Sequence, residues 1–342
     1  MGKQWLYPMT PSVNSALTSV QMFEKGKEFE ALTDSISLAR LIKSDVKTLT
    51  KWVEKPQYTQ FEIPKPGGAK RLIQAPVAEL KDLQHRLNLY LQCFYHYLKP
   101  PCAYGFILNA ADELRIRNIY TNAVQHVNAQ WVLNMDIKDF FPSINSQMLY
   151  TALKDLLGFP KQLIGLFSGL CTCRGKLPTG SPTSPILSNL VCLDLDMKLQ
   201  SLVRAYDAVY TRYADDLTFS FDTKPATETL AAIRQVIESQ GFIINDTKTH
   251  LTPIAKKPEV TGLVLMPPKL DVSRTFLKDL KRDIKFWHWL LLEENLLRGF
   301  GTDKLMDKLR RSIMGQIQFV GFVRGKDDRK YLRLVASMQQ EN

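Results

Sequence analysis

Hydrophobic and polar positions along the chain follow helical spacing in most segments and strand spacing in a few. Apolar residues three and four apart, with Gly and Pro at the boundaries, predict helices at 35–52 (as two short helices), 80–98, 146–157, 183–204, 225–240, 273–297 and 302–323. β-rich runs predict strands at 131–136, 242–244 and 260–265 and hairpins over 61–73 and 209–220. Helices and strands alternate without the regular βαβ repeat of a doubly wound sheet, so the pattern predicts an α+β fold.

The composition excludes a disordered chain and favours a polyanionic partner. Of the 342 residues, 45% are hydrophobic and 10% aromatic, which is enough to build a substantial core in two packed units or one large one. The formal net charge is +11. Clustered Lys and Arg gain binding free energy by releasing the counterions of phosphates, so nucleic acid is the expected partner and a membrane surface the competing one.

Targeting and cysteine usage point to a cytoplasmic protein. No stretch approaches the ~18 uninterrupted apolar residues of a spanning helix, and the first residues lack the apolar run of a signal peptide. We therefore expect no membrane partner. The five cysteines, an odd number in apolar surroundings, favour a reducing compartment. Because Cys171 and Cys173 have no second Cys/His pair at finger spacing, structural thiols are preferred over a zinc site.

Three aspartates stand where predicted strands end. Asp136 closes one strand, and Asp215 and Asp216 lie at the tip of the hairpin over 209–220. Each is ordinary when taken singly, because aspartate caps turns. If the strands pair, the carboxylates and the Ile137 carbonyl have the hard oxygens to hold two Mg²⁺ ions about 3.5–4 Å apart, as phosphoryl transfer to a 3′-hydroxyl requires. A hydrolytic nuclease would use similar carboxylates, so this pattern alone leaves both reactions open.

The segments around these aspartates resemble the ordered motifs of reverse transcriptases, and two further elements resemble the bacterial retron branch. Tyr213-Ala214-Asp215-Asp216 resembles the catalytic box of that family. Residues 136–144 resemble its first-aspartate motif, and residues 177–185 resemble the motif between the two. Asn122-Ala123-Val124-Gln125-His126 and Val260-Thr261-Gly262 resemble two elements of the retron branch. The resemblance covers roughly residues 35–323.

This resemblance implies a right-hand polymerase with fingers, a palm of antiparallel sheet plus helices, and a helical thumb. Fingers and palm are expected over 35–265 and a thumb that binds template and primer over 266–342, whereas 1–34 is an N-terminal extension of unassigned role. The implied activity is RNA-directed DNA synthesis with two Mg²⁺ ions and deoxynucleoside triphosphates. The alternatives are a stand-alone or group II intron-like reverse transcriptase and a catalytically silent RNA-binding scaffold.

The retron resemblance implies more about the partners. Such an enzyme copies part of a cognate structured noncoding RNA, priming from a guanosine 2′-hydroxyl, and leaves single-stranded DNA linked to RNA (msDNA). It usually works beside an effector protein in anti-phage defence.

The resemblance also assigns roles to individual residues. Asp136, Asp215 and Asp216 would hold metal together with the Ile137 carbonyl, and Lys248 would be the general acid toward pyrophosphate. Lys65 and Arg71 would contact the triphosphate of the nucleotide, and Phe141 would lie under its sugar as a steric gate. Thr179 would also contact the nucleotide, and Gly180 would let the backbone approach it closely. Thr179 stands where the family commonly has glutamine, which alters that contact.

Two groups of residues are expected at the nucleic acid. Asn122 and His126 belong to the element associated with retron RNA binding, although a single histidine near a strand is more often a structural hydrogen-bonding group than a catalyst. In the thumb, basic residues recur at helical spacing among aromatics, which favours phosphate tracking over a merely solvated face. They are Lys278, Lys281, Arg282 and Lys285, and the same face could extend to Lys308, Arg310, Arg311 and Arg324.

Overall fold

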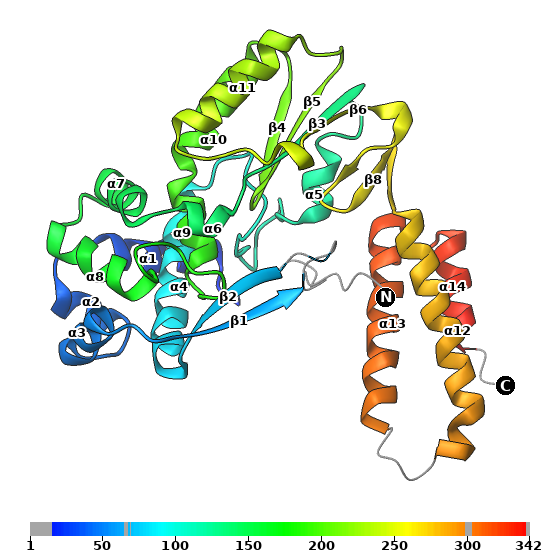
Figure 1. Cartoon of the computed structure of the whole chain (residues 1–342), viewed down its shortest axis with the longest axis horizontal. Coiled ribbons are helices and arrows are strands. Elements are labelled where there is room, and N and C mark those ends of the chain that lie inside the picture. The colour runs from blue at the N-terminus through cyan, green and yellow to red at the C-terminus, as the bar shows by residue number, and fades with distance from the viewer. Residues whose placement is uncertain (1–15, 65–67, 69, 298–302, 340–342) are drawn as a thin grey trace.

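The computed structural model describes residues 16–64, 68, 70–297 and 303–339. It confirms the α+β class: helices dominate the two ends of the chain and antiparallel sheets lie between them (Figure 1). Lys65 lies outside the described residues. Among the residues described, no helix is both long and apolar enough to cross a membrane.

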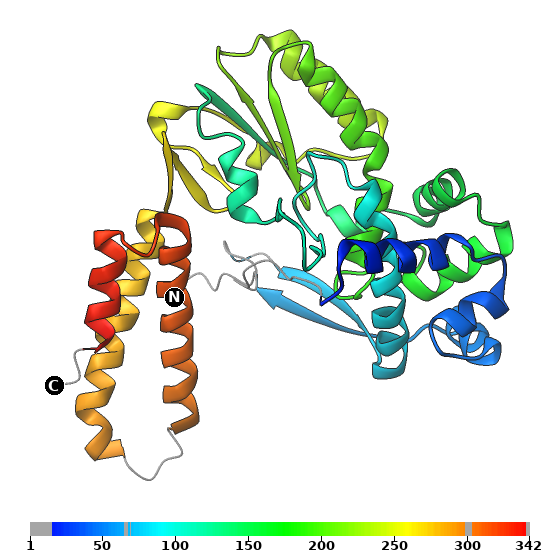
Figure 2. The same cartoon turned by 180° about the vertical axis from the view of Figure 1, so that it is seen from behind.

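The N-terminal part is a helical layer with a projecting hairpin. Its elements are α1 (Ser19–Glu30), α2 (Ser35–Leu41), α3 (Val46–Glu54), β1 (Tyr58–Pro64), β2 (Lys70–Pro76) and α4 (Ala78–Leu98). The two short helices and the hairpin confirm their predictions. Helices α1 to α3 begin at side-chain caps, which bind otherwise unpaired backbone N–H groups. Helix α1 packs against α4 (Figure 2). At this contact the rings of Phe29 and Phe94 lie 5.7 Å apart.

The central sheet has the strand order β4-β5-β3-β6, and all neighbouring strands are antiparallel. The strands are β3 (Trp131–Asp136), β4 (Val209–Tyr213), β5 (Asp216–Phe221) and β6 (His250–Pro253). Side chains of α10 (Leu193–Arg204) and α11 (Thr227–Ser239) share one apolar core with β5. The predicted strand 131–136 and the hairpin over 209–220 are therefore confirmed.

Two predictions for this region were wrong in detail. The helix expected over 183–204 is two helices, α9 (Ser184–Val191) and α10, which meet at Cys192. The run at 242–244 makes a single bridge, from Ile244 to Ile137, and forms no strand within the described chain. Both runs carry a continuous apolar pattern, which gives no sign of a break or of missing pairing partners.

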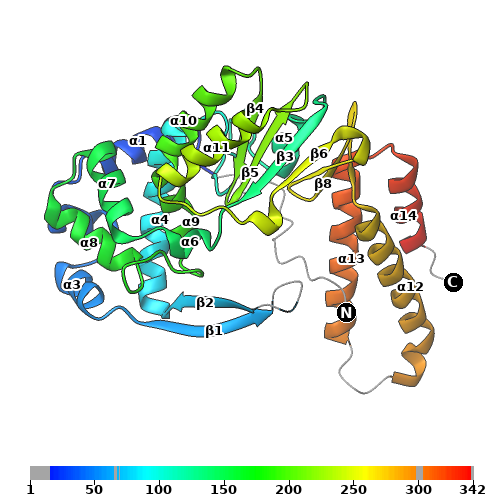
Figure 3. The same cartoon turned by 45° about the horizontal axis from the view of Figure 1, so that its top comes forward.

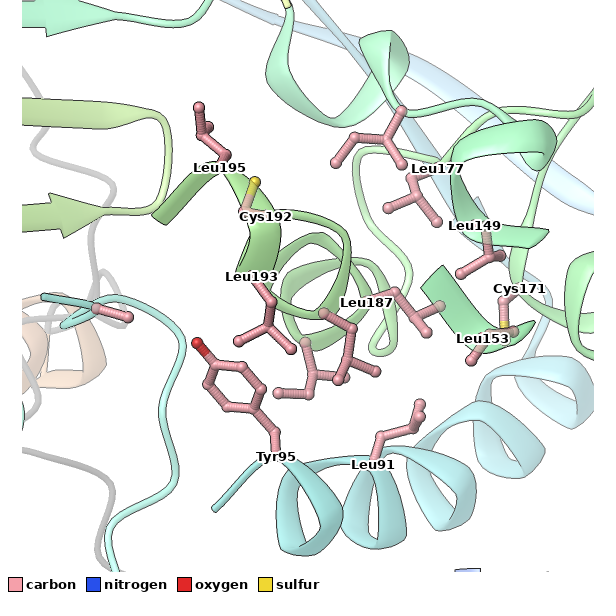
Figure 4. Packing of buried hydrophobic residues seen from close by; sticks show 14 of the residues in the cluster. Leu91, Tyr95, Leu149, Leu153, Cys171, Leu177, Leu187, Cys192, Leu193 and Leu195 are labelled. Atoms are coloured by element: carbon pink, nitrogen blue, oxygen red, sulfur yellow. The ribbon is translucent and has the colours of Figure 1, made fainter. Parts of the chain in front are cut away.

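Short helices connect these elements and surround the core. They are α5 (Ile119–Val124), α6 (Phe140–Ser143), α7 (Ser146–Leu157), α8 (Lys161–Cys171), η1 (Asp246–Lys248) and η2 (Ile254–Lys256). Helix α7 ends at Gly158, whose φ of +64° suits glycine. Figure 4 shows Leu187 of α9 and Cys192 among buried side chains of α4, α7 and α8, so α9 is held from several sides. All five cysteines are free and buried.

The C-terminal part combines a small sheet with three helices (Figure 3). The sheet is β7 (Glu259–Val260), β8 (Leu263–Met266) and β9 (Lys269–Val272), and the helices are α12 (Arg274–Leu297), α13 (Asp303–Arg324) and α14 (Arg329–Gln339). Leu263 and Leu265 share a second apolar core with Leu280 of α12 and Ile317 of α13. The expected boundary between 265 and 266 falls inside β8, and the small sheet shares this core with the C-terminal helices and with Val132 of β3.

Candidate active site

Strand pairing brings the three predicted carboxylates together. In the antiparallel pair of β3 and β5, Asp136 is directly opposite Asp216. A two-residue turn of Ala214 and Asp215 joins β4 to β5, with Ala214 at a φ of +60°. The Asp215 carbonyl accepts a hydrogen bond from the Ile137 N–H at 3.0 Å. Directly opposed residues have Cβ atoms about 4.5–5.5 Å apart, so the side chains of Asp136 and Asp216 lie close together at the end of the sheet, next to Asp215.

The cluster is short of positive charge. Burial, together with the neighbouring carboxylates of Asp215 and Asp136, raises the pKa of Asp216 to about 7. Burial and the charge of Asp136 likewise raise the pKa of Asp215, against the opposing charges of Lys248 and Arg71. These shifts mean that ionising Asp215 and Asp216 beside Asp136 is costly in the metal-free protein. A bound cation would remove that cost, and its binding would release protons near neutral pH.

Lys248 places a positive charge next to the carboxylates. Its Nζ donates a hydrogen bond to Asp136 Oδ2 at 2.7 Å, although the lysine side chain is 60% exposed. Burial lowers the pKa of Lys248, but the hydrogen bond to Asp136 and the charges of the three aspartates outweigh it and raise the pKa overall. The amine therefore keeps its proton throughout the neutral range.

The donor set fits a hard divalent cation that keeps water and substrate as ligands. Within the described chain no group of three His, Cys, Asp or Glu side chains converges as a ready-made metal site. Mg²⁺-type ions seldom need one, because one or two carboxylates, water and substrate phosphates suffice. Asp136 and Asp215, with the Ile137 carbonyl, would hold such an ion, and Asp216 adjoins them.

The residues expected to contact the nucleotide lie on several different elements. Phe141 lies in α6, with its ring centroid 5.7 Å from that of Phe106 and 5.6 Å from that of Phe140. Arg71 is exposed on β2. The Thr179 carbonyl accepts a hydrogen bond from the N–H of Gln74 in β2 at 2.9 Å, which fixes the loop that carries it.

Gly180 has a structural reason to be glycine. Its φ is +135°, and an added Cβ would lie 3.0 Å from the Gln74 carbonyl oxygen and 3.1 Å from the Ile73 side chain. The close approach seen here is to β2, so glycine at this position is required by the fold before any nucleotide arrives.

A cavity of about 890 Å³ runs from the carboxylates to the C-terminal helices. One end is lined by Asp136, Asp216 and Lys248 and the far wall by Gly315, Phe319 and Phe322 of α13. The loop between α4 and α5 also lines it, through Tyr104, Phe106 and Arg117, with the Arg117 guanidinium 4.8 Å from the Tyr104 ring centroid. Sequence reasoning missed this loop because it has no periodic pattern, although its aromatic and basic residues were visible.

The expected contact of Asn122 and His126 with nucleic acid is corrected by their burial. Asn122 is 1% exposed and His126 is 0% exposed. The His126 ring nitrogens lie 2.8 Å from Ser220 Oγ and 2.7 Å from Thr211 Oγ1. The imidazole therefore links β4 to β5, in agreement with the interpretation of a lone histidine as a structural hydrogen-bonding group. Burial lowers its pKa to about 3.

Changing His126 to glutamine is expected to flatten the loss of stability in acid. The imidazole titrates near 6.5 when unfolded and near 3 when folded, so the unfolded state holds one more proton between these values. The native protein then loses about 1.4 kcal/mol of unfolding free energy per pH unit of acidification. This stability is fully present above pH 6.5 and is lost as the pH falls toward 3. Urea unfolding at several pH values measures the slope.

The matched control is His85→Gln, because His85 is exposed on α4. That variant should keep the slope of the wild type. Equal slopes in the two variants would show that His126 is not the titrating group.

The two sets of thumb cations lie on different surfaces. Lys278, Lys281, Arg282 and Lys285 are exposed on α12, opposite its buried residues Leu280, Ile284 and Trp287, and none of them lines the cavity. On α13, the exposed Lys308 and Arg311 precede Gly315 by seven and four residues and so share its cavity-facing side. Arg310 is exposed on another side of α13, and Arg324 forms ion pairs with Asp271 and Asp328.

Paired carboxylates at the end of an antiparallel sheet, beside a large cavity walled by a helical domain, define a right-hand nucleic-acid polymerase. Residues 63–265 match the family model described as reverse transcriptase (RNA-dependent DNA polymerase). The chain belongs to this family and is of the retron type. It is 30% identical to the retron Ec86 reverse transcriptase of Escherichia coli, covering 67% of this chain and 69% of that protein.

Two further retron reverse transcriptases are similar to this chain. The retron Ec73 reverse transcriptase of Escherichia coli is 31% identical over 72% of this chain and 79% of its own length. The retron Mx162 reverse transcriptase of Myxococcus xanthus is 34% identical over 61% of this chain, which spans 47% of that protein. Among solved structures, telomerase from Candida albicans in complex with a telomeric RNA fragment is similar with a TM-score of 0.46 at 12% identity, covering 85% of this chain and 64% of that one.

Proposed function

We propose that the protein copies part of a cognate structured noncoding RNA into single-stranded DNA that stays linked to the RNA. Synthesis starts from a guanosine 2′-hydroxyl, uses deoxynucleoside triphosphates, and serves an anti-phage system that includes an effector protein. The observation that carries the polymerase step is the meeting of Asp136, Asp215 and Asp216 at the end of the central sheet, where Asp136 and Asp216 line the cavity. Its retron character is supported by relatives that are named retron reverse transcriptases.

The chain's own residues position the reactants and supply a proton. Two Mg²⁺ ions held at the aspartates would lower the pKa of the attacking hydroxyl and neutralise the charge of the transferring phosphate. Arg71, exposed on β2, binds the triphosphate, and Phe141 excludes a ribose 2′-hydroxyl. Lys248 keeps its proton at neutral pH and is exposed enough to leave Asp136, so its Nζ passes that proton to the leaving pyrophosphate.

The test is to express the protein with its native flanking sequence and extract the nucleic acid that co-purifies with it. We expect a short discrete DNA whose mobility changes after ribonuclease treatment, and no such DNA from Asp215→Asn. A wild-type protein that extends an added primer on an RNA template but retains no RNA-linked DNA would remain a reverse transcriptase and overturn the retron mechanism.

The two thumb surfaces are expected to bind different nucleic acids. Lys308 and Arg311 lie on the same side of α13 as Gly315, which lines the cavity, so replacing both with Ala should weaken binding of a plain primer–template and reduce its salt slope by about 2. The four α12 cations lie outside the cavity, where a structured RNA can reach them. Replacing Lys278 and Lys285 with Ala should weaken binding of the cognate RNA and reduce the salt slope of that binding by a similar amount. Binding of the primer–template should not change.

Fluorescence anisotropy at several salt concentrations measures both slopes. Each double variant is the matched control of the other, because the same charge is removed from the same domain. Equal losses on both ligands would mean that charge alone, and not its placement, decides binding.

A further inference from the structure

The turn that carries Asp215 and Asp216 lies against a glycine from a distant loop. A Cβ added to Gly105 would be 2.5 Å from the Ala214 backbone nitrogen and 3.0 Å from the Tyr213 carbonyl carbon. Both atoms belong to the backbone, so no side-chain rotation relieves the overlap. Any residue larger than glycine has to displace the turn, the loop, or both by about 1 Å to reach ordinary contact.

The loop is fixed to β4 by backbone hydrogen bonds. The Arg212 N–H donates to the Cys102 carbonyl, and the Tyr104 N–H donates to the Arg212 carbonyl, both at 2.8 Å. Ala103 and Arg212 form a parallel bridge. The loop thus runs beside β4, joined to it by this single bridge, and Gly105 follows at the turn.

A buried side-chain network holds the same two segments. Arg212 is 1% exposed, and its Nε and Nη2 donate to the two carboxylate oxygens of Asp196 at 2.8 and 2.6 Å. Its Nη1 donates to Asn189 Oδ1 at 2.9 Å and to the Ala214 carbonyl at 3.3 Å. Asn189 Nδ2 in turn donates to the Gly105 carbonyl at 3.0 Å. These hydrogen bonds connect α10, β4 and α9 with the loop that carries Gly105 and with the turn before Asp215.

The main effect of this network is to fix the position of the turn, and its contribution to stability is small. A buried ion pair adds little net stability over apolar residues of similar volume, because both charges lose their hydration. The planar guanidinium fork nevertheless fixes direction as well as distance, and here it points at the turn itself. Apolar packing could fill the same volume without specifying where the Ala214 carbonyl lies.

We infer that Gly105, Asn189, Arg212 and Asp196 form a brace that sets the position of Asp215 and Asp216, and that these four are positioning residues for the metal-dependent step. The inference rests on the proposed function, in which the two aspartates hold metal. The brace acts on the arrangement of the carboxylates, so it has to affect metal affinity as well as the rate of nucleotide incorporation.

The experiment compares glycine-to-alanine variants of the full chain. Gly105→Ala is expected to lower kcat/KM for nucleotide incorporation by about 100-fold, since a displacement near 1 Å costs about that much. Mn²⁺ affinity, measured without substrate from the electron paramagnetic resonance signal of free Mn²⁺, should weaken about 10- to 100-fold, as when the partner of a metal ligand is lost.

Two glycines of α8 give matched controls. Gly165→Ala meets nothing within 4 Å and should leave both quantities unchanged. Gly169→Ala would approach Val53 Cγ1 at 2.6 Å, far from the turn, and should lower thermal stability without weakening Mn²⁺ binding. Asn189→Asp keeps an acceptor for Arg212 but loses the donor to Gly105, and should weaken Mn²⁺ binding about 10-fold. It decides the matter if Gly105→Ala does not fold.

The outcomes separate the brace from the proposed function. If the wild type neither binds Mn²⁺ nor incorporates nucleotides, the proposed function fails. If the wild type does both while Gly105→Ala and Asn189→Asp bind Mn²⁺ like Gly169→Ala, the brace is overturned and the network is ordinary core structure.

Discussion

Replacing Asp136 with asparagine is expected to lower the rate of DNA synthesis at least ~1000-fold without unfolding the protein, because a catalytic metal contributes several kcal/mol and each 1.4 kcal/mol is tenfold in rate. Asp136 lies opposite Asp216 and accepts a hydrogen bond from Lys248, so it interacts with both the carboxylate of the neighbouring strand and the lysine of the site. Its charge also helps to raise the pKa of both neighbouring aspartates. Removing that charge relieves repulsion, so the metal-free variant should be as stable as the wild type or more so.

Single-turnover primer extension on an RNA template and thermal unfolding without metal measure the two effects. The control is Asp222→Asn, an exposed aspartate just after β5, which should change neither. An Asp136→Asn enzyme that keeps a tenth of the wild-type rate would place the essential metal elsewhere.

The parts of the fold that could be predicted are those whose signals are local. The strand ending at Asp136 and the hairpin carrying Asp215 and Asp216 have β-rich runs bounded by turn residues, and both form as expected. The meeting of the carboxylates followed once those strands were assumed to pair. The kink at Cys192 has no local signal, because the apolar pattern continues through it.

The parts that could not be predicted depend on contacts between distant segments. Gly105 and Asn189 are ordinary residues in the sequence, and only the fold brings them to the turn before Asp215. His126 was visible as part of a motif, but its burial under β4 and β5 is a tertiary property. The side of each thumb helix that faces the cavity likewise depends on how α12 and α13 pack, which spacing alone does not give.

Replacing Phe141 with alanine is expected to lower the preference for deoxyribonucleotides over ribonucleotides by about 100-fold in kcat/KM, the scale on which a packed site rejects an added hydroxyl. Phe141 follows Asp136 by five residues, and α6 begins after Asp139 at a φ of +48°. Its ring lies 5.7 Å from Phe106 and 5.6 Å from Phe140, with interplanar angles of 30° and 39°. A ring packed against two others is restrained from moving aside for a 2′-hydroxyl.

The effect should come from faster incorporation of ribonucleotides, since the smaller side chain opens space without touching the carboxylates. Incorporation of deoxyribonucleotides by the same enzyme on the same template is the internal reference. Phe286→Ala, which removes an exposed ring on α12, is the matched control and should leave the preference unchanged. A Phe141→Ala enzyme with the wild-type preference would show that another group excludes the ribose hydroxyl, and Phe106, whose ring packs against Phe141 and lines the cavity, would be the next residue to test.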